Sequence, residues 1–201
     1  MQISCGIMKN QAKEVVDISK YLYERKLVSG KAGNVSLRFK SENGDIIAIT
    51  PTLKSLGNLE EKDIVLVDID GNVLSKGNPS SELDMHLAIY KKRKDVNGIA
   101  HTHSPFATGF AFSEKRIKRH DRFGKISAPY LEDLEYEAPG SENLAKKACE
   151  ALEEEETLVL KDHGIIAIGK NLEEAAELVE FVEDIAKTQF ISYMLNLSDE
   201  L

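Results

Sequence analysis

Two histidines, His101 and His103, are separated by a single residue in a segment, 97–103, whose composition predicts a β-strand. Side chains at i and i+2 of a strand share a face, about 7 Å apart. That spacing suits two imidazoles on one divalent ion, although two exposed histidines at a sheet edge share it. A third, His163, lies between two apolar runs and precedes Gly164, a pattern typical of a turn that presents one side chain. Three imidazoles with an open position are typical of a catalytic zinc site, and a hydrogen-bonded core histidine is the alternative for His163.

A carboxylate that could work with this metal is Glu82, in the sequence Pro79-Ser80-Ser81-Glu82 at the start of a predicted helix. A carboxylate beside a metal can serve as a ligand and, once released, as a proton acceptor. The simpler interpretation is that an acidic residue favours the positive end of the helix dipole. His86, one helical turn later, is expected either to orient Glu82 or to lie on the helix surface.

Three turns built from small residues suggest a phosphate site. They are Gly33-Asn34 before a predicted strand, Thr50-Pro51-Thr52 after one, and Ser80-Ser81 at the helix start. Each offers backbone N–H groups or hydroxyls, and the last adds a positive helix end. Each is an ordinary turn by itself, so only their convergence in space would make a site.

Helical and extended patterns alternate along the chain. Helices are expected over 10–26, 82–94, from 104 onward, over 141–156 with a serine cap, and over 171–197 with an asparagine cap. Strands are expected over 34–39, 45–50, 64–69, 97–103 and in two runs within 157–169. The stretch 34–39 alternates apolar and polar residues as a half-buried strand does, and 113–125 gives no assignment.

The first two strands flank the turn 41–45 and predict a hairpin, which makes the sheet mixed or antiparallel. Alternating helices and strands favour a helix–sheet–helix sandwich. A dinucleotide-binding fold would need a glycine-rich turn after the first strand, and the sequence has none there.

The composition predicts one domain over 1–201, because 42% apolar and 30% charged residues can bury a core and solvate a surface. A net charge of −8 disfavours nucleic acid and anionic membranes as partners. No apolar run approaches the roughly 20 residues of a bilayer span, and the first ten residues lack a secretory core. Cys5 and Cys149 form no disulfide framework, so a cytoplasmic location is expected.

These motifs, in this order, resemble the class II aldolase/epimerase family typified by L-fuculose-1-phosphate aldolase. The matching segments are Ala32–Ser36, Ile49–Thr52, Pro79–Glu82 with Met85-His86, Ala100–Pro105 and Asp162–Gly164. The likeness runs from about residue 10 to 195. Each motif alone is common, whereas the combination is very specific.

The resemblance implies a three-layer α/β/α sandwich around a mostly antiparallel sheet, and a homotetramer with active sites at subunit boundaries. It also implies that His101, His103 and His163 bind zinc, with Glu82 as the fourth ligand and the base. The residues that it assigns to the substrate phosphate are Gly33, Asn34, Thr52, Ser80 and Ser81.

The implied reaction is the reversible cleavage of a ketose phosphate, such as L-fuculose 1-phosphate, into dihydroxyacetone phosphate and an aldehyde. Breaking a C–C bond beside a ketone develops negative charge on the two vicinal oxygens of an enediolate, which a divalent cation stabilises. Glu82 would shuttle the proton, and the phosphate would supply remote binding energy.

Two departures from the family pattern concern the substrate. Leu53 stands where the family's threonine–proline turn carries glycine, and 118–124 has no tyrosine where these aldolases place a proton donor. Tyr130 and Tyr193 are the candidate substitutes.

Asp121 lies where related pentulose-phosphate 4-epimerases place an acid/base, so epimerisation is the alternative, together with dehydration of a sugar phosphate. A non-catalytic interaction module, like the adducin head domain, is the least favoured reading because all three histidines and Glu82 are present.

Overall fold

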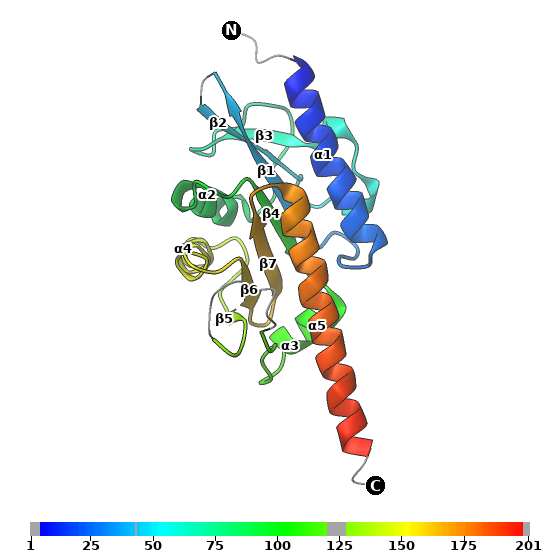
Figure 1. Cartoon of the computed structure of the whole chain (residues 1–201). Helices are drawn as coiled ribbons and strands as arrows, with labels where there is room; N and C mark the ends of the chain where they lie inside the picture. The colour runs from blue at the N-terminus through cyan, green and yellow to red at the C-terminus, as the bar shows by residue number, and fades with distance from the viewer. Residues whose placement is uncertain (1–4, 43, 120–127, 199–201) are drawn as a thin grey trace.

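The computed structural model describes residues 5–42, 44–119 and 128–198, without the side chains of 5–8 and 198. A seven-stranded sheet forms the middle of the described chain, in the order β3-β2-β1-β4-β7-β6-β5 (Figure 1). Its strands are β1 (Asn34–Ser41), β2 (Gly44–Ile49), β3 (Val65–Asp68), β4 (Gly98–Thr102), β5 (Glu132–Leu134), β6 (Thr157–Leu160) and β7 (Gly164–Gly169). All described neighbours pair antiparallel except β5 and β6, so the expected mixed, mostly antiparallel sheet is confirmed.

Helices cover both faces of the sheet. They are α1 (Cys5–Glu24), α2 (Leu83–Lys92), α3 (Pro105–Ala111), α4 (Glu142–Ala151) and α5 (Leu172–Ser198), with two short 3-10 helices, η1 (Leu56–Asn58) and η2 (Glu61–Asp63). Figure 1 shows α1 and α5 along one face and α2 and α4 on the other. The core is divided in the same way, because one buried cluster includes residues of α1, α3 and α5 and the other residues of α2 and α4. The three-layer sandwich is therefore confirmed.

The strand β1 alternates apolar and polar residues, as predicted, but both of its faces are buried. Val35 and Leu37 enter the core beneath α1 and α5, as predicted. Asn34, Ser36 and Arg38 point the other way but are also buried, so β1 is not a half-buried strand. The reason is that α2 covers this face. The His86 side chain hydrogen-bonds to Asn34 and Ser36, and the backbone carbonyl of Tyr90 accepts from Arg38.

Two predicted helix ends are wrong. The first helix ends at Glu24 rather than Lys26, because Lys26 adopts a left-handed φ of 61° and the N–H of Leu27 bonds to the carbonyl of Leu22. The helix expected over 141–156 ends at Ala151.

A run of four glutamates, 153–156, follows α4, and negative charge is unfavourable at the C-terminal end of a helix dipole. The Arg93 guanidinium donates hydrogen bonds to the carbonyl of Leu152, at 2.7 Å, and to two carbonyls of the run, Glu153 O and Glu155 O, both at 3.3 Å.

The first helix also begins at Cys5 rather than at residue 10, five residues earlier than predicted, and the remaining element boundaries agree with the predictions to within about two residues. The predicted caps are present, since Ser141 accepts from Leu144 N and Asn171 from Glu174 N. The strand β5 was not predicted, because its three residues carry two charges and no periodicity. Within the unassigned stretch, Lys118 bridges to Tyr130, and 120–127 lie outside the described residues.

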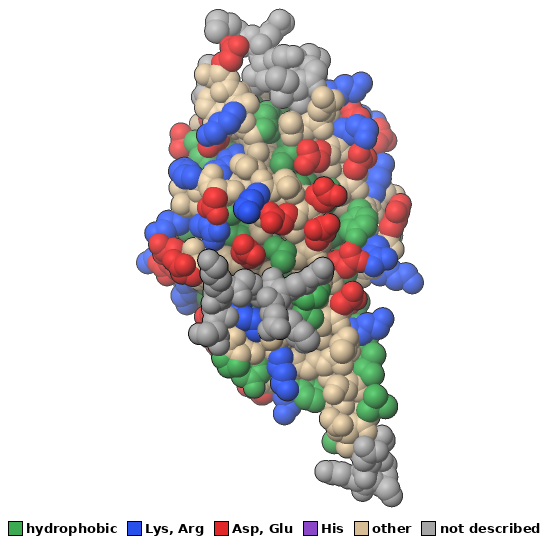
Figure 2. Space-filling view, viewed as in Figure 1, with side chains coloured by type: hydrophobic (Ala, Val, Ile, Leu, Met, Phe, Trp, Pro, Cys, Tyr) green, Lys and Arg blue, Asp and Glu red, His purple; other side chains and the backbone are tan. Residues whose placement is uncertain are grey.

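Among the described residues, no helix is long and apolar enough to cross a membrane. Figure 2 shows acidic and basic side chains interspersed over one face, with hydrophobic side chains along the lower part of α5. Exposed hydrophobic residues of this helix are Phe190, Ile191, Met194, Leu195 and Leu197.

Candidate active site

Three elements bring the predicted histidines together at one end of β4. His101 lies on β4 opposite Asn34 of β1, His103 directly follows the strand, and His163 lies in the turn between β6 and β7. The ring centroid of His101 lies 4.9 Å from that of His103 and 4.7 Å from that of His163. Their nitrogen atoms lie within 4.8 Å of one another. The three imidazoles therefore converge.

Two glycines let the backbone segments approach closely enough for this convergence. A Cβ at Gly164 would lie 2.5 Å from the carbonyl oxygen of Thr102, and one at Gly33 would lie 2.8 Å from that of His101. Gly33 also has a φ of 80°, which other residues rarely adopt. Any side chain here would push apart the strands that carry the histidines.

The donor pattern of the rings fits a cation. The Nδ1–H of His101 donates to the carbonyl of Ile165 at 2.8 Å, which leaves its Nε2 as a lone pair. That Nε2 faces the Nε2 atoms of His103, at 3.1 Å, and His163, at 3.3 Å. Only one of these two nitrogens at a time can donate to the lone pair, whereas one shared cation satisfies all three.

The rings of His103 and His163 are also in the protonation state that metal binding needs. Burial, and then repulsion from neighbouring imidazoles, lowers the pKa of His103 to about 4 and that of His163 to about 4. Both rings are therefore neutral at neutral pH and offer lone pairs to a metal.

Glu82 completes the cluster from the N-cap position of α2. Its side chain makes no capping hydrogen bond and turns instead toward the histidines, with Oε2 3.3 Å from His101 Nε2 and Oε1 3.6 Å from His163 Nε2. Asn34 Nδ2 donates to Oε2 at 2.7 Å, and Oε1 has no hydrogen-bond partner among the described residues. Burial raises the pKa of this carboxyl, but nearby His101 and the Asn34 hydrogen bond outweigh it, so the pKa lies below its ordinary value.

The three small-residue turns also come together, around Thr50. Its hydroxyl accepts from the N–H of Val35 at 3.1 Å, and its carbonyl accepts from the N–H of Ser80 at 3.0 Å. Thr52 donates its N–H to Asn78 O at 3.1 Å. The backbone amides of Thr52 and Ser80 are thus engaged within the protein.

Other residues of the predicted phosphate site differ in their surroundings. Ser80 is buried and accepts from the N–H of Glu82 at 3.3 Å, whereas Ser81 is exposed. The side chain of Asn34 is used at both ends, by Glu82 and by His86. Leu53 has a φ of 59°, so leucine holds the left-handed conformation that the glycine of the family pattern would adopt without strain.

One acid/base candidate lies outside the described residues, and the other two each contact neighbours of their own. Asp121 falls within 120–127, outside the described residues. Tyr130 pairs with Lys118, and the Arg116 guanidinium lies 5.4 Å from its ring centroid.

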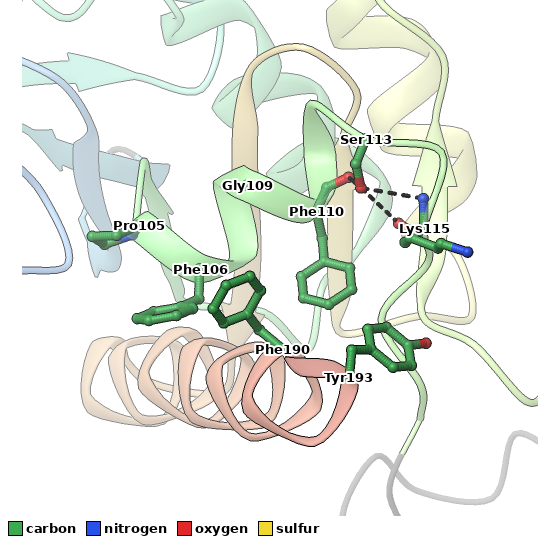
Figure 3. Close-up of a pocket in the computed structure, with 8 residues that line it drawn as sticks. All are labelled: Pro105, Phe106, Gly109, Phe110, Ser113, Lys115, Phe190 and Tyr193. Carbon is green, nitrogen blue, oxygen red and sulfur yellow. Dashed lines mark hydrogen bonds between the residues drawn. The ribbon is translucent and has the colours of Figure 1, made fainter. Parts of the chain in front are cut away.

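Tyr193 lines a cavity of about 350 Å³ between α3 and α5. Figure 3 shows its ring facing the cavity together with Phe106, Phe110 and Phe190. The Tyr193 hydroxyl accepts a hydrogen bond from Gln189 at 2.9 Å. The helix α3, which forms one wall, begins two residues after His103.

A three-layer α/β/α sandwich with a glutamate and three histidines gathered at one end of its sheet is the architecture of a metal-dependent enzyme domain. The chain belongs to the family described as Class II Aldolase and Adducin N-terminal domain, whose model matches residues 13–190.

Three relatives illustrate the range of this family. The L-fuculose phosphate aldolase of Methanocaldococcus jannaschii is 40% identical over 91% of this chain and 97% of its own. The 3-oxo-tetronate 4-phosphate decarboxylase of Haemophilus influenzae is 29% identical over 90% of this chain and 87% of its own. A solved structure of an L-fuculose 1-phosphate aldolase matches with a TM-score of 0.83 and 32% identity, covering 92% of this chain and 87% of its own.

Two polar neighbours of the site, Ser36 and Tyr90, were not found from the sequence. His86 was found, and it is fully buried rather than on the helix surface. Ser36 Oγ lies 2.7 Å from His86 Nδ1 and 2.8 Å from the Tyr90 hydroxyl, and all three side chains are fully buried. The sequence does contain the two patterns that produce this arrangement. Polar residues occupy alternate positions in β1, and polar residues recur every fourth position, at 82, 86 and 90, along α2. The arrangement could not be predicted without knowing that these two elements face each other.

Proposed function

We propose that this protein is a metal-dependent aldolase that cleaves a ketose phosphate, such as L-fuculose 1-phosphate, into dihydroxyacetone phosphate and an aldehyde. The observation that carries the proposal is the convergence of three imidazoles and one buried carboxylate beside turns rich in hydroxyls and glycine. Membership of the class II aldolase family and relatives named as aldolases of phosphorylated sugars support the same reaction.

The groups that would hold the metal, Zn²⁺ in this proposal, are His101, His103 and His163, with Glu82 as a fourth ligand. A bound divalent cation supplies positive charge where negative charge develops on the substrate oxygens, an effect worth several kcal/mol. The Nε2 atoms of His103 and His163 both face Nε2 of His101, and the buried carboxylate of Glu82 beside them adds the negative charge that suits that cation.

The proton is moved by Glu82. Its carboxylate is buried and ionised, and it has one oxygen without a hydrogen-bond partner among the described residues, so Oε1 can accept a proton from the carbon beside the ketone. In the cleavage direction Glu82 acts as the acid. It returns the proton to that carbon, which becomes a carbon of dihydroxyacetone phosphate. The second acid/base, which acts on the aldehyde oxygen, is assigned to Tyr130 or Asp121.

The phosphate is proposed to lie against the turns that meet at Thr50. The residues of this binding site are Gly33, Asn34, Thr52, Ser80 and Ser81, with the N-terminus of α2 adding a favourable dipole. Holding the phosphate fixes the reacting carbon, and the remote binding energy contributes to catalysis.

The test follows the exchange of a C–H hydrogen of dihydroxyacetone phosphate with deuterium in D₂O, by proton NMR, in protein loaded with one equivalent of Zn²⁺. We expect catalysed exchange in the wild type, and at least about a hundredfold slower exchange in Glu82→Gln, which removes the general base. Glu173→Gln, on the exposed start of α5, is the matched control and should exchange like the wild type.

Three outcomes would contradict this function. They are a protein that binds no divalent metal, a wild type that exchanges no hydrogen, and equal turnover of unphosphorylated dihydroxyacetone. A panel of ketose 1- and 5-phosphates then separates cleavage from epimerisation and dehydration, the alternative reactions on this scaffold.

A homotetramer with active sites at subunit boundaries is proposed as the working assembly, supported by the family resemblance and the exposed hydrophobic residues of α5. Sedimentation velocity of the metal-loaded protein tests it. The single domain over 1–201 and the cytoplasmic location stay predictions.

A further inference from the structure

A continuous column of buried polar side chains runs from Glu82 into the layer between the sheet and α2. Its members come from alternate residues of β1 and from every fourth residue of α2: Asn34, Ser36, Arg38, Glu82, His86 and Tyr90. None is more than 5% exposed. The two periods, two in a strand and four in a helix, place each group within reach of the next.

The hydrogen bonds of the column have one direction. Asn34 must turn its NH₂ toward the Glu82 carboxylate, which can only accept, so its Oδ1 faces His86 Nε2 at 2.6 Å. His86 is neutral, because burial lowers its pKa to about 3. A neutral ring that donates from Nε2 accepts at Nδ1, where Ser36 Oγ lies at 2.7 Å. The Tyr90 hydroxyl, 2.8 Å from Ser36 Oγ, is the next polar group in the series.

The far end of the column is fixed by Arg38. Its guanidinium donates to the carbonyl of Tyr90 at 2.8 Å and lies 5.1 Å from the centroid of that ring. The Tyr90 hydroxyl is also within 3.0 Å of the carbonyl of Ser36. The ring and the serine therefore have little freedom to turn.

We infer that His86, Ser36 and Tyr90 are positioning residues that hold the Asn34 amide in one orientation and thereby make the two oxygens of Glu82 unequal. Oε2 is anchored by the amide, while Oε1 is left without a protein donor among the described residues and faces His163. Oε1 is then the oxygen that exchanges the proton with substrate. The inference rests on the proposed function.

Without the donor of His86, Asn34 can rotate its amide and direct Oδ1 at the carboxylate. A carbonyl facing a carboxylate repels it, so Glu82 would leave the position in which Oε1 is free. Burying so many polar groups is expensive, and apolar side chains of the same volume would stabilise the layer at least as well. Orienting Glu82 accounts for their presence.

The decisive comparison is between two amides at position 86. Glutamine places its amide nitrogen near the position of Nε2 and can still donate to Asn34, whereas asparagine reaches only the position of Nδ1, beside Ser36. We expect deuterium exchange into dihydroxyacetone phosphate to fall about 10- to 100-fold in kcat in His86→Asn, the range for residues that orient metal ligands. His86→Gln should stay within about threefold of the wild type. The loss in His86→Asn should fall on kcat rather than on KM, because Gly33, Thr52, Ser80 and Ser81 of the proposed phosphate site are untouched.

A second pair of variants tests the hydroxyl that fixes the ring. Ser36→Ala should slow exchange about fivefold, the equivalent of about one neutral hydrogen bond. Ser19→Ala is its matched control, because the Ser19 hydroxyl is equally buried but has no partner among the described residues. Equal rates for the two alanine variants would remove Ser36 from the column's function.

A readout independent of metal and activity is the tautomer of His86. In ¹⁵N-histidine-labelled, metal-free protein, His86 should show a protonated Nε2 and a bare Nδ1 that accepts a hydrogen bond. The signal is identified by its loss in His86→Gln. The opposite tautomer, or equal losses of exchange in His86→Asn and His86→Gln, would overturn the inference.

The two proposals fail in different ways. A wild type that exchanges no hydrogen removes the proposed function and this role with it. A wild type that exchanges normally while His86→Asn is just as fast removes only the positioning role.

Discussion

Opposite faces of β1 are buried to the same degree but filled with different chemistry. Val35 and Leu37 pack into an apolar core beneath α1 and α5, whereas Asn34, Ser36 and Arg38 lie against α2 in a network of hydrogen bonds. Apolar contacts have no direction, so the first face stabilises the fold without specifying the position of any one atom. Hydrogen bonds have direction, and the second face leads atom by atom to Glu82.

The difference predicts that substitutions on the two faces separate stability from catalysis, with Arg38 as the exception. Its guanidinium binds the carbonyls of Tyr90, at 2.8 Å, and Lys94, at 2.9 Å, beyond the end of α2. Arg38→Met removes the donor of both carbonyls, the first of them buried, and we expect a loss of about 3–5 kcal/mol in the free energy of unfolding by urea.

Arg25→Met is the control for the arginine exchange. Arg38 lies 3.9 Å from a carboxylate oxygen of Asp45, and Arg25 likewise pairs with the carboxylate of Glu180, but the Arg25 side chain is 55% exposed. The expected loss is below about 1 kcal/mol. Equal losses for the two variants would mean that the buried end of the column has no special structural role.

A smaller effect is expected from neighbouring residues on the two faces. Leu37→Ala should lower the free energy of unfolding by about 2–4 kcal/mol, because it leaves a cavity under α1. Its metal content and its exchange of dihydroxyacetone phosphate hydrogen should stay at wild-type values. Ser36→Ala, one residue away, should show the reverse balance, with slower exchange and a smaller loss of stability. If Leu37→Ala slows exchange at 25 °C while still folded, the faces are coupled and the separation is wrong.

The same contrast explains what could be predicted from the sequence. Apolar periodicity predicted most of the strands of the sheet and the helices that cover it. The alternation in β1 correctly placed Val35 and Leu37 in the core. That alternation cannot say whether the polar face meets water or a second polar surface. The sequence therefore assigns Asn34 to phosphate binding from its turn, but it gives no sign that the Asn34 side chain hydrogen-bonds to Glu82 and His86.

The histidines could be found because a metal site needs rare residue types at constrained spacings, and His101, His103 and His163 do converge. The helix end at Ala151 could not, because it depends on charge repulsion within 153–156 and on Arg93, which reaches from another element.

A pH experiment measures the polar face alone. The pKa of His86 is about 3 in the folded protein against an ordinary 6.5, so between these values the unfolded chain binds a proton that the folded chain does not. The contribution of His86 to stability is complete above pH 6.5 and is lost as the pH falls toward 3, by at most about 1.4 kcal/mol per unit.

Urea unfolding of wild type and His86→Gln at several pH values between 6.5 and 4.5 isolates this contribution, because the other titrating groups are common to both. The stability of the wild type should fall more steeply. Leu37→Ala is the control on the apolar face and should run parallel to the wild type. Parallel curves for wild type and His86→Gln would mean that His86 is protonated in the folded protein. The ring would then have no acceptor nitrogen for Ser36, which contradicts the proposed hydrogen-bond directions.

The smallest expected effect compares two left-handed residues, one for each side of the sheet. Lys26 ends α1 at a φ of 61°, and Leu53 follows the Thr50–Thr52 turn at a φ of 59°. Glycine relieves the clash of Cβ in this conformation, so Lys26→Gly and Leu53→Gly should each raise the free energy of unfolding by up to about 1 kcal/mol.

Only Leu53→Gly should also change the KM for a phosphorylated substrate, because Leu53 adjoins the proposed phosphate turn and its side chain is 74% exposed there. The KM is measured with dihydroxyacetone phosphate in the exchange assay, with Lys26→Gly as the reference. An equal, unchanged KM in both variants would place the phosphate away from this turn. A change in both would show instead that the mobility of α1 reaches the site, and that the apolar face has a share in binding after all.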